Sequence, residues 1–272
     1  MKPFSMGLVL SVGLLTACAS PQRDNNSTLL MQQIAPTGKL RAAISVGATG
    51  NQFRATISPS TNQPRGVPVD LATALGKKLG VTVDLVSYSN YVDLLEAAAR
   101  GAWDVTFITF DEERAKVMDF GPAYFLSEFT YLVPAGSAIR SQNEVDRPGV
   151  RIAVAEGSVT ARNRERSLKS AILRRFKTLA EIRDQVRAGN VDAAAAGRET
   201  LAGLATQLPG ARVLEGTFNV EGVAIAVPKH RPASLAYVTD FIETAKATGL
   251  VRQAFDNAGF KEAAVAPAAS RR

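Results

Sequence analysis

The chain has 272 residues, of which 46% are apolar and 21% charged, and this ordinary globular composition excludes disordered and collagen-like classes. Its net charge is +7, but Lys and Arg are scattered and no nucleic-acid motif appears, so we expect no nucleic-acid partner. With one Cys, Cys18, and one His, His230, we expect no metal cluster, no cofactor and no Cys/His or Ser/His catalysis.

Residues 1–17 combine a lysine, a short apolar stretch and small residues, a pattern typical of a secretory signal peptide. The end of this stretch, Leu15-Thr16-Ala17-Cys18, resembles a lipobox, which implies lipidation of Cys18 and anchoring to a membrane. The alternative is a cytosolic protein with a hydrophobic N-terminus. The polar residues 18–37 predict a loop-like tether that spans roughly 25 Å as a flexible coil. No apolar run beyond the leader is long enough for a transmembrane helix.

Residues 38–100 alternate between patterns typical of strands and helices. We predict a strand at 38–44, a helix at 66–80 that ends at Gly80, a strand at 81–87 and a helix at 91–100. The loop at 45–64 has a length that usually indicates a binding loop. From the residues alone, Phe53 in this loop can lie in the core, and Tyr91, at a helix start, can pack on the sheet.

The stretch 101–124 contains a short β-branched and aromatic run that ends at Thr109 and is followed by a charged cluster. Asp111 can cap a helix over 112–118. Arg114 then lies near the carboxyl end of a buried strand, where open α/β sheets bind ligands, and its planar guanidinium suits a carboxylate or phosphate. The alternative is that Arg114 pairs with Glu113 or Asp111 on a solvated helix face.

The strand pattern begins again at 150–155 and leads into a Gly-Ser turn before a helix. Backbone amides there, together with the hydroxyls of Ser158 and Thr160, predict an anion site. The many Arg and Lys between 162 and 177 predict a solvated helix face, and a further helix is expected at 179–189.

Residues 189–196 repeat the G-x-x-D-strand pattern of residues 101–105, so the chain predicts two similar lobes in which Asp104 and Asp192 have structural roles. The remaining expected elements are strands at 129–133 and 221–228 and helices at 233–247 and 250–257. Residues 261–272 are rich in Ala and Pro and predict a disordered tail.

One pattern resembles the signature of the family 3 extracellular solute-binding proteins, the amino-acid-type receptors of ABC importers. Its positions here are Gly101, Asp104, Thr109, Arg114, Asp119, Phe120, Pro122 (one residue early) and Tyr124. The resemblance covers residues 38–260 and implies that Arg114 clamps the ligand's α-carboxylate with support from Thr109. It also implies the alternative positions of two rings: Phe53 could replace the family's aromatic cluster that packs on the ligand, and Tyr91 falls where relatives often place an aromatic near the cleft. The chain departs from the family's T-P-E-R with Asp111-Glu112-Glu113-Arg114, which adds a negative charge at the site.

The resemblance implies an α/β fold of the type II periplasmic-binding-protein class, with two lobes that each hold a mixed sheet flanked by helices. Lobe 1 would comprise residues 38–133 and 223–260, lobe 2 residues 134–222, with two crossings near Val133 and Val223. A small carboxylate-bearing solute would bind between the lobes and be enclosed by hinge closure. The implied partners are an inner-membrane ABC permease and, through Cys18, the membrane on the periplasmic side.

Gly197 stands where the resemblance implies a carboxylate for the ligand's α-ammonium, five residues after Asp192. A buried ammonium without a carboxylate is disfavoured. We therefore expect a carboxylate ligand without the usual ammonium contact, such as a dicarboxylate or deaminated acid, unless Glu199 or Asp111 reaches in. Arg198 beside Gly197 would favour a second anionic group.

An enzyme on the same fold is the main rival, because periplasmic cyclohexadienyl dehydratases resemble these receptors. Such an enzyme needs a positioned acid, for which Glu199 or Glu156 would be a candidate. No residue pattern requires one, so we expect a binding protein and no catalytic residues. A sensing domain is a third class, but no second transmembrane or signalling segment appears.

Overall fold

The structure is a computed structural model that describes residues 22–47 and 53–269. The expected signal peptide and Cys18 lie outside these residues, as do the side chains at positions 22–24. In the described part, no helix is long and apolar enough to cross a membrane.

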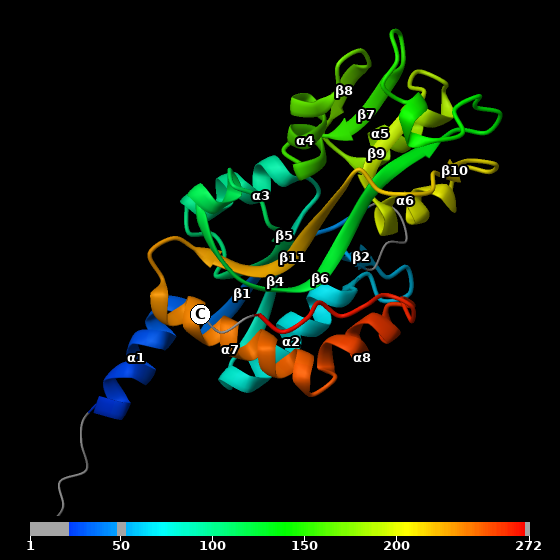
Figure 1. The fold of residues 1–272 in the computed structure, drawn as a ribbon. Coiled ribbons are helices and arrows are strands. Elements are labelled where there is room, and N and C mark those ends of the chain that lie inside the picture. Colours follow the sequence, from blue (N-terminus) through cyan, green and yellow to red (C-terminus); the bar gives the residue numbers. More distant parts are fainter. Residues whose placement is uncertain (1–21, 48–52, 270–272) are drawn as a thin grey trace, which may run out of the picture.

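One mixed sheet of nine strands runs through the molecule, flanked by helices (Figure 1). The strand order is β4-β1-β5-β11-β6-β9-β7-β8, and β10 pairs with β6 at the side. These strands are β1 Lys39–Ser45, β4 Thr82–Tyr88, β5 Val105–Thr109, β6 Met118–Val133, β7 Arg151–Ala155, β8 Ile172–Phe176, β9 Ala193–Gly197, β10 Arg212–Val213 and β11 Asn219–Pro228. A small separate sheet pairs β2 Thr56–Ile57 with β3 Pro64–Arg65.

The two ends of the sheet repeat one β-α-β-α-β unit. At one end β1 pairs in parallel with β4 and β5, and at the other end β7 pairs in parallel with β8 and β9. Parallel neighbours need crossover connections, which the helices supply. The helices are α2 Val67–Leu79 and α3 Tyr91–Ala99 in the first unit, and α4 Val159–Ser167 and α5 Leu179–Arg187 in the second. The expected two similar units are therefore present.

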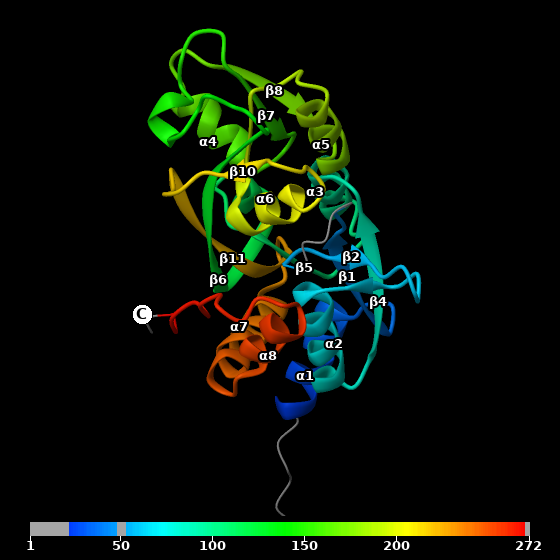
Figure 2. The same cartoon turned by 90° about the vertical axis from the view of Figure 1, so that its right-hand side faces the viewer.

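Two long antiparallel strands, β6 and β11, join the two ends. The first part of β6 pairs with β11, while its last part, from Phe129 to Leu132, pairs with β9. Strand β11 pairs with β5 from Val223 onward. We call the part around β4, β1 and β5 the first half and the part around β9, β7 and β8 the second half. Figure 2 shows β6 and β11 running between them.

Each half has its own apolar core. In the first half, side chains of β1, β5 and α2 pack against two helices from the end of the chain, α7 Pro232–Ala247 and α8 Leu250–Asn257. In the second half, α5 and α6 Arg198–Ala205 pack on one face of β7 and β9, and a second cluster covers the other face. The apolar clusters of the two halves are therefore separate.

Asp104 and Asp192 hold equivalent places in the two units. Asp104 accepts hydrogen bonds from the backbone and guanidinium of Arg41 on β1, and it also pairs with Arg231. Asp192 accepts the same set of bonds from Arg151 on β7. The expected structural role of both carboxylates therefore agrees with their contacts: each ties the start of one strand to the turn before another.

Four local expectations were wrong. The expected loop-like tether contains the helix α1 Gln22–Ile34, which packs against α7. The helix expected over 112–118 is a short 3-10 turn, Arg114–Lys116, followed at once by β6.

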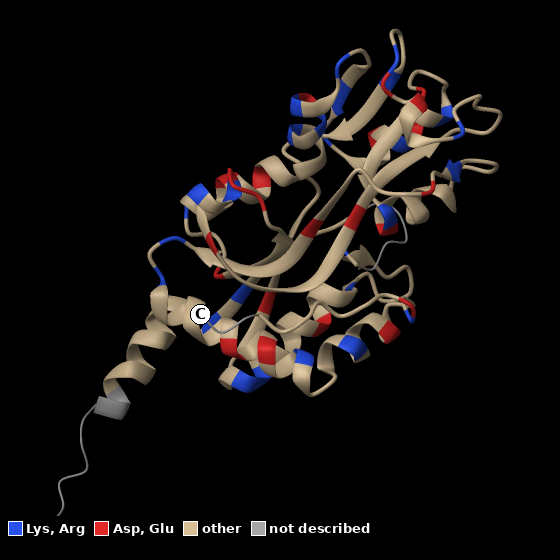
Figure 3. Cartoon of the chain, in the orientation of Figure 1, with Lys and Arg blue, Asp and Glu red and all other residues tan. Residues whose placement is uncertain are grey.

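The basic stretch expected as one helix face divides into α4 and the strand β8. The tail up to residue 269 is held in place, since Ala266 donates its N–H to Tyr124 O and Val265 bridges to Phe125. Figure 3 shows Lys and Arg spread over both halves, as the scattered sequence positions predict.

Candidate functional site

A cavity of about 90 Å³ lies between the two halves, at the ends of strands from both. All seven residues expected to contact a ligand line it. Phe53, Tyr91, Thr109 and Arg114 contribute from the first half, and Ser158, Thr160 and Gly197 from the second. They converge because the carboxyl ends of parallel strands meet at one edge of each unit, and β6 and β11 set those edges face to face.

Arg114 is the central cation of this cavity and is only 2% exposed. Its Nη1 donates to Thr109 O at 2.8 Å, and its Nη2 donates to Gly157 O of the second half at 3.1 Å. Its Nε is buried without a hydrogen-bond partner. Burial lowers the pKa of Arg114 to about 10, so the guanidinium remains charged at neutral pH.

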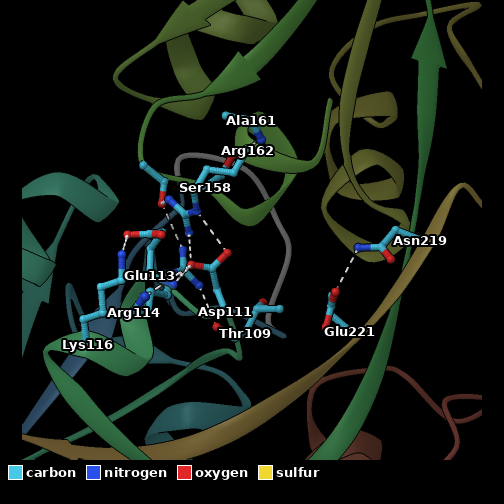
Figure 4. A network of polar contacts seen from close by, with 11 residues as sticks. Thr109, Asp111, Glu113, Arg114, Lys116, Ser158, Ala161, Arg162, Asn219 and Glu221 are labelled. Carbon is cyan, nitrogen blue, oxygen red and sulfur yellow. Dashed lines mark hydrogen bonds and ion pairs between the residues drawn. The ribbon is translucent and has the colours of Figure 1, made fainter. Parts of the chain in front are cut away.

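The alternative in which Arg114 pairs on a solvated face does not match these contacts. Glu113 pairs with Lys116. Asp111 accepts the backbone N–H of Arg114, but its carboxylate pairs with Arg162. Among the described residues, no carboxylate lies within ion-pair distance of the Arg114 guanidinium. Figure 4 shows this network around Arg114. A buried cation without a protein counter-ion is the arrangement expected of an anion site.

The second half contributes the start of α4. Ser158 is the N-cap of this helix and its side chain accepts the Ala161 N–H at 3.0 Å, which leaves the hydroxyl hydrogen able to donate. Thr160 is 3% exposed and lies in the first turn. The first-turn amides and the positive end of the helix dipole favour a negative group here.

Gly197 ends β9 and is the N-cap of α6, with φ −60°, so no unusual backbone angle requires a glycine there. A Cβ at this position would lie 2.7 Å from Ser127 Oγ and 3.6 Å from Glu199 Oε2. The space that a side chain at 197 would occupy is therefore already held by Ser127 and Glu199.

Glu199 is the only acidic residue among the described residues that line the cavity. It accepts a hydrogen bond from Ser127 Oγ at 3.3 Å, and burial raises the pKa of its carboxyl above the usual value. Glu199 and Asp111 are the two acids that the sequence offers as partners for a ligand's ammonium. Glu199 reaches the cavity, whereas Asp111 pairs with Arg162. Glu156 is exposed, and Arg198 bonds Glu128 and Gly216 O outside the cavity.

Phe53 and Tyr91 have mixed roles. Phe53 is 8% exposed and packs on Phe125 and Phe260, whose ring centroids lie 4.3 and 4.1 Å from its own. Most of the Phe53 side chain therefore lies in the core. Its remaining surface lines the cavity. The ring of Tyr91 lies under the guanidinium of Arg114, whose Cζ is 4.8 Å from the ring centroid. Tyr91 therefore supports the cationic group of the site.

Arg54 also lines the cavity and was missed by the sequence analysis. Its Cζ is 4.7 Å from the centroid of the same Tyr91 ring, and it donates to Ser45 Oγ. The only sequence signal was its position beside Phe53 in a loop of binding-loop length.

The family model of the bacterial extracellular solute-binding proteins, family 3, matches residues 44–258. A glutamine-binding protein of Geobacillus stearothermophilus is 27% identical over 243 residues, which cover 81% of this chain and 89% of the relative. The ABC transporter glutamine-binding protein GlnH of Bacillus subtilis (strain 168) is 24% identical, with 91% and 93% covered.

Solved structures agree on the fold. An ancestral amino acid-binding protein, described as a precursor of cyclohexadienyl dehydratase, superposes with a TM-score of 0.73 at 27% identity and covers 85% of this chain and 98% of its own. A mutant of ArgBP from T. maritima superposes with a TM-score of 0.74 at 20% identity, with 84% and 98% covered. The expected type II fold is thus confirmed, and the chain belongs to the bacterial extracellular solute-binding proteins of family 3.

Proposed function

We propose that this protein captures an amino acid or closely related organic acid between its two halves and presents it to an ABC permease. One observation carries the proposal: Arg114 is buried and has no carboxylate at ion-pair distance among the described residues, and hydroxyl groups from both halves line the same cavity. The relatives named as glutamine-binding proteins support an amino-acid ligand.

The ligand's α-carboxylate would bind the guanidinium of Arg114, with hydroxyl donors from Thr109, Ser158 and Thr160. Arg114 offers a planar fork that matches a carboxylate, and the first turn of α4 adds amide donors. Binding would use groups from both halves at once, which couples ligand capture to their approach.

Glu199 would accept the ligand's α-ammonium. A ligand without that ammonium is expected only if no acid reaches the vacant position at Gly197, and Glu199 Oε2 lies 3.6 Å from where a Cβ of residue 197 would be. Ser127 holds the carboxyl in this place. An amino acid is therefore the ligand that this pair of groups favours, and a mixed anionic and cationic ligand compensates both Arg114 and Glu199.

Closure of the two halves around the ligand is the motion we propose. The bonds from Arg114 to Gly157 O and from Arg162 to Asp111 join the halves and would form as the cleft closes. Addition of the ligand should then reduce the radius of gyration in solution scattering. An unchanged radius at saturation would contradict opening and closing.

We propose a periplasmic location with an anchor on a lipidated Cys18, supported by the family's description as extracellular and by the lipobox-like Leu15-Thr16-Ala17-Cys18. Mass spectrometry of the membrane-extracted protein would test it, because lipidation adds diacylglycerol and fatty-acid mass to Cys18. An unmodified Cys18 in a chain that still carries residues 1–17 would contradict it.

The test of function is native mass spectrometry of freshly purified protein, followed by a thermal-shift panel of the common L-amino acids and their 2-hydroxy analogues. At about a hundred times its dissociation constant, a ligand adds roughly 2.7 kcal/mol of stability. We expect at least one L-amino acid to stabilise the protein more than its 2-hydroxy analogue. Stabilisation by no amino acid would contradict the proposal.

A further inference from the structure

The cavity holds a second arginine that the function proposed above does not use. Arg54 lines the cavity, and its Nε is buried without a hydrogen-bond partner, as is the Nε of Arg114. The two guanidiniums share one aromatic ring, since both Cζ atoms lie within 5 Å of the Tyr91 centroid, at 4.7 and 4.8 Å. Two arginines, each with one buried Nε that no described residue accepts, therefore line the same small cavity.

The described residues do not balance the positive charge of this pair. Arg162, the third arginine nearby, is neutralised by Asp111 at 2.8 Å. Within the described residues, neither Arg54 nor Arg114 has a carboxylate at ion-pair distance, and positions 48–52 before Arg54 are Ala, Thr, Gly, Asn and Gln. Glu199, the one acid of the lining, accepts its bond from Ser127 and extends from the second half. The described lining of the cavity thus contains two arginines without a counter-ion and one acidic residue.

The structure is consistent with a ligand that supplies the missing negative charge. Two arginines placed close together repel each other, and a bound anion on each would remove that repulsion and satisfy the two free Nε donors. Both guanidiniums already donate to protein oxygen atoms, but a ligand with a single carboxylate would leave one of the two without a counter-ion. The alternative is that both arginines hold one carboxylate from two sides.

We propose that Arg54 forms a second anion subsite and that the ligand is a compact dicarboxylic solute, an acidic amino acid such as glutamate or aspartate. Arg114 binds its α-carboxylate and Arg54 its distal carboxylate. This assignment rests on the proposed function for the α-carboxylate and amine, and adds the chemical class of the ligand's far end. It also moves the second cationic group, which the sequence placed at Arg198, to the opposite half of the cavity.

Calorimetry with matched pairs of ligands tests the assignment, because each pair differs only in the distal charge. Protein refolded without ligand is titrated with L-glutamate and L-glutamine, L-aspartate and L-asparagine, and the amine-free diacids glutarate and succinate. The variants are Arg54→Met, which keeps an apolar stem over Tyr91, and Arg65→Ala as a control, since Arg65 is exposed and outside the cavity.

We expect at least one acidic amino acid to bind about tenfold or more tightly than its amide, since a bond to a charged group is worth roughly one decade or more. Arg54→Met should remove this preference by weakening the acidic ligand about tenfold while the amide changes less than about threefold. Arg65→Ala should change neither. The wild-type comparison alone decides the case if Arg54→Met fails to fold.

The assignment would be overturned if the amides bind as tightly as the acids, or if Arg54→Met weakens the binding of acid and amide alike. The second result would indicate that both arginines hold the same carboxylate. If only glutarate or succinate binds, and Arg54→Met weakens it, the second anion subsite stands while the amino-acid part of the proposed function fails. If none of the six binds, the assignment is wrong, and the thermal-shift panel decides the proposed function separately.

Discussion

Asp111 and Arg162 form a bidentate ion pair that joins the two halves of the molecule. Arg162 Nε lies 2.9 Å from Asp111 Oδ2, and Arg162 Nη2 lies 2.8 Å from Oδ1 (Figure 4). Asp111 follows β5 in the first half, and Arg162 belongs to α4 in the second. Burial alone would raise the pKa of Asp111, but the hydrogen bond and charge of Arg162 hold it below its usual value. The negative charge that departs from the family pattern thus takes part in an ion pair between the two halves.

If the halves close as proposed, Asp111→Asn should accelerate ligand release, because it removes the charge from a partly buried ion pair that joins the two halves. We expect the dissociation rate to rise about tenfold with a smaller change in the association rate. Stopped-flow fluorescence measures both rates. Glu113→Gln is the control, since Glu113 pairs with Lys116 on the same exposed turn. Equal dissociation rates for wild type and Asp111→Asn would show that the Asp111–Arg162 ion pair does not slow ligand release.

Arg114→Ala should abolish high-affinity binding of any carboxylate ligand. Loss of one member of a buried charge pair costs about 2 to 5 kcal/mol, or roughly thirtyfold or more in affinity. Arg114→Lys should also bind poorly, because an ammonium does not reproduce the two parallel donors of a guanidinium. Calorimetry measures the affinities. Near-wild-type affinity in the alanine variant would remove Arg114 from the site.

Glu199→Gln should discriminate between ligands with and without an amine. The variant keeps the size of the side chain and its acceptor for Ser127, but it loses the charge that would face an ammonium. Affinity for the cognate amino acid should fall about thirtyfold, while affinity for its 2-hydroxy analogue should change little. The same loss for both compounds would indicate that Glu199 acts on the cavity's shape and not on the amine.

The same variant should alter the pH dependence of stability in the ligand-free protein. Burial raises the folded-state pKa of Glu199 above its unfolded value, so the stability linked to its protonated form is present at low pH and lost as pH rises through the raised pKa. Glu199→Gln should therefore be more stable than wild type near neutral pH, and this difference should vanish toward about pH 4. Urea denaturation at a series of pH values measures it. A constant difference at all pH values would contradict the argument.

Asp104→Ala and Asp192→Ala provide a matched comparison of two equivalent places. The side chain of Asp104 is fully buried and serves two arginines, whereas that of Asp192 is 36% exposed and serves one. Removing Asp104 leaves buried positive charge and should cost about 3 to 5 kcal/mol of unfolding free energy. Removing Asp192 should cost about 1 kcal/mol. Denaturation midpoints in urea would contradict this ranking if Asp192→Ala were the more damaging change.

Much of the fold could be predicted from the sequence because each half repeats a strand and helix pattern, and the G-x-x-D motif marks the same turn twice. Strand β6 was found only at its end. The first part of β6 contains Gly121 and Pro122, two residue types that usually interrupt a strand. Pairing with β11 nevertheless makes this part of the chain a strand. Strand β8 was hidden by its two consecutive arginines, which suggested a solvated helix face.

Sequence patterns predicted the site residues that lie at the ends of strands. They did not predict the residues whose place in the site depends on the direction of the side chain. Thr109 ends a strand, and Arg114, Ser158 and Thr160 each follow one, so topology alone brings them together. Arg54 comes from an irregular loop, and no periodicity indicates which way its side chain points. Glu199 was named as a candidate partner for an ammonium and as a candidate acid of the enzyme alternative, but it could not be assigned to the site, because a helix start can direct its second residue inward or outward.

The C-terminal segment has a practical consequence for handling the protein. Residues 265–269 are fastened to the body by Ala266 N–H to Tyr124 O, by Lys246 Nζ to Pro267 O and by Ala269 N–H to Glu243. Tyr124 lies on β6, three residues before Ser127 at the cavity. A fluorescent label attached within residues 265–269 would thus lie at a fixed point beside β6, one of the strands that join the halves. Such a label needs a spacer, so that its bulk does not strain the strands whose proposed bending it is meant to report.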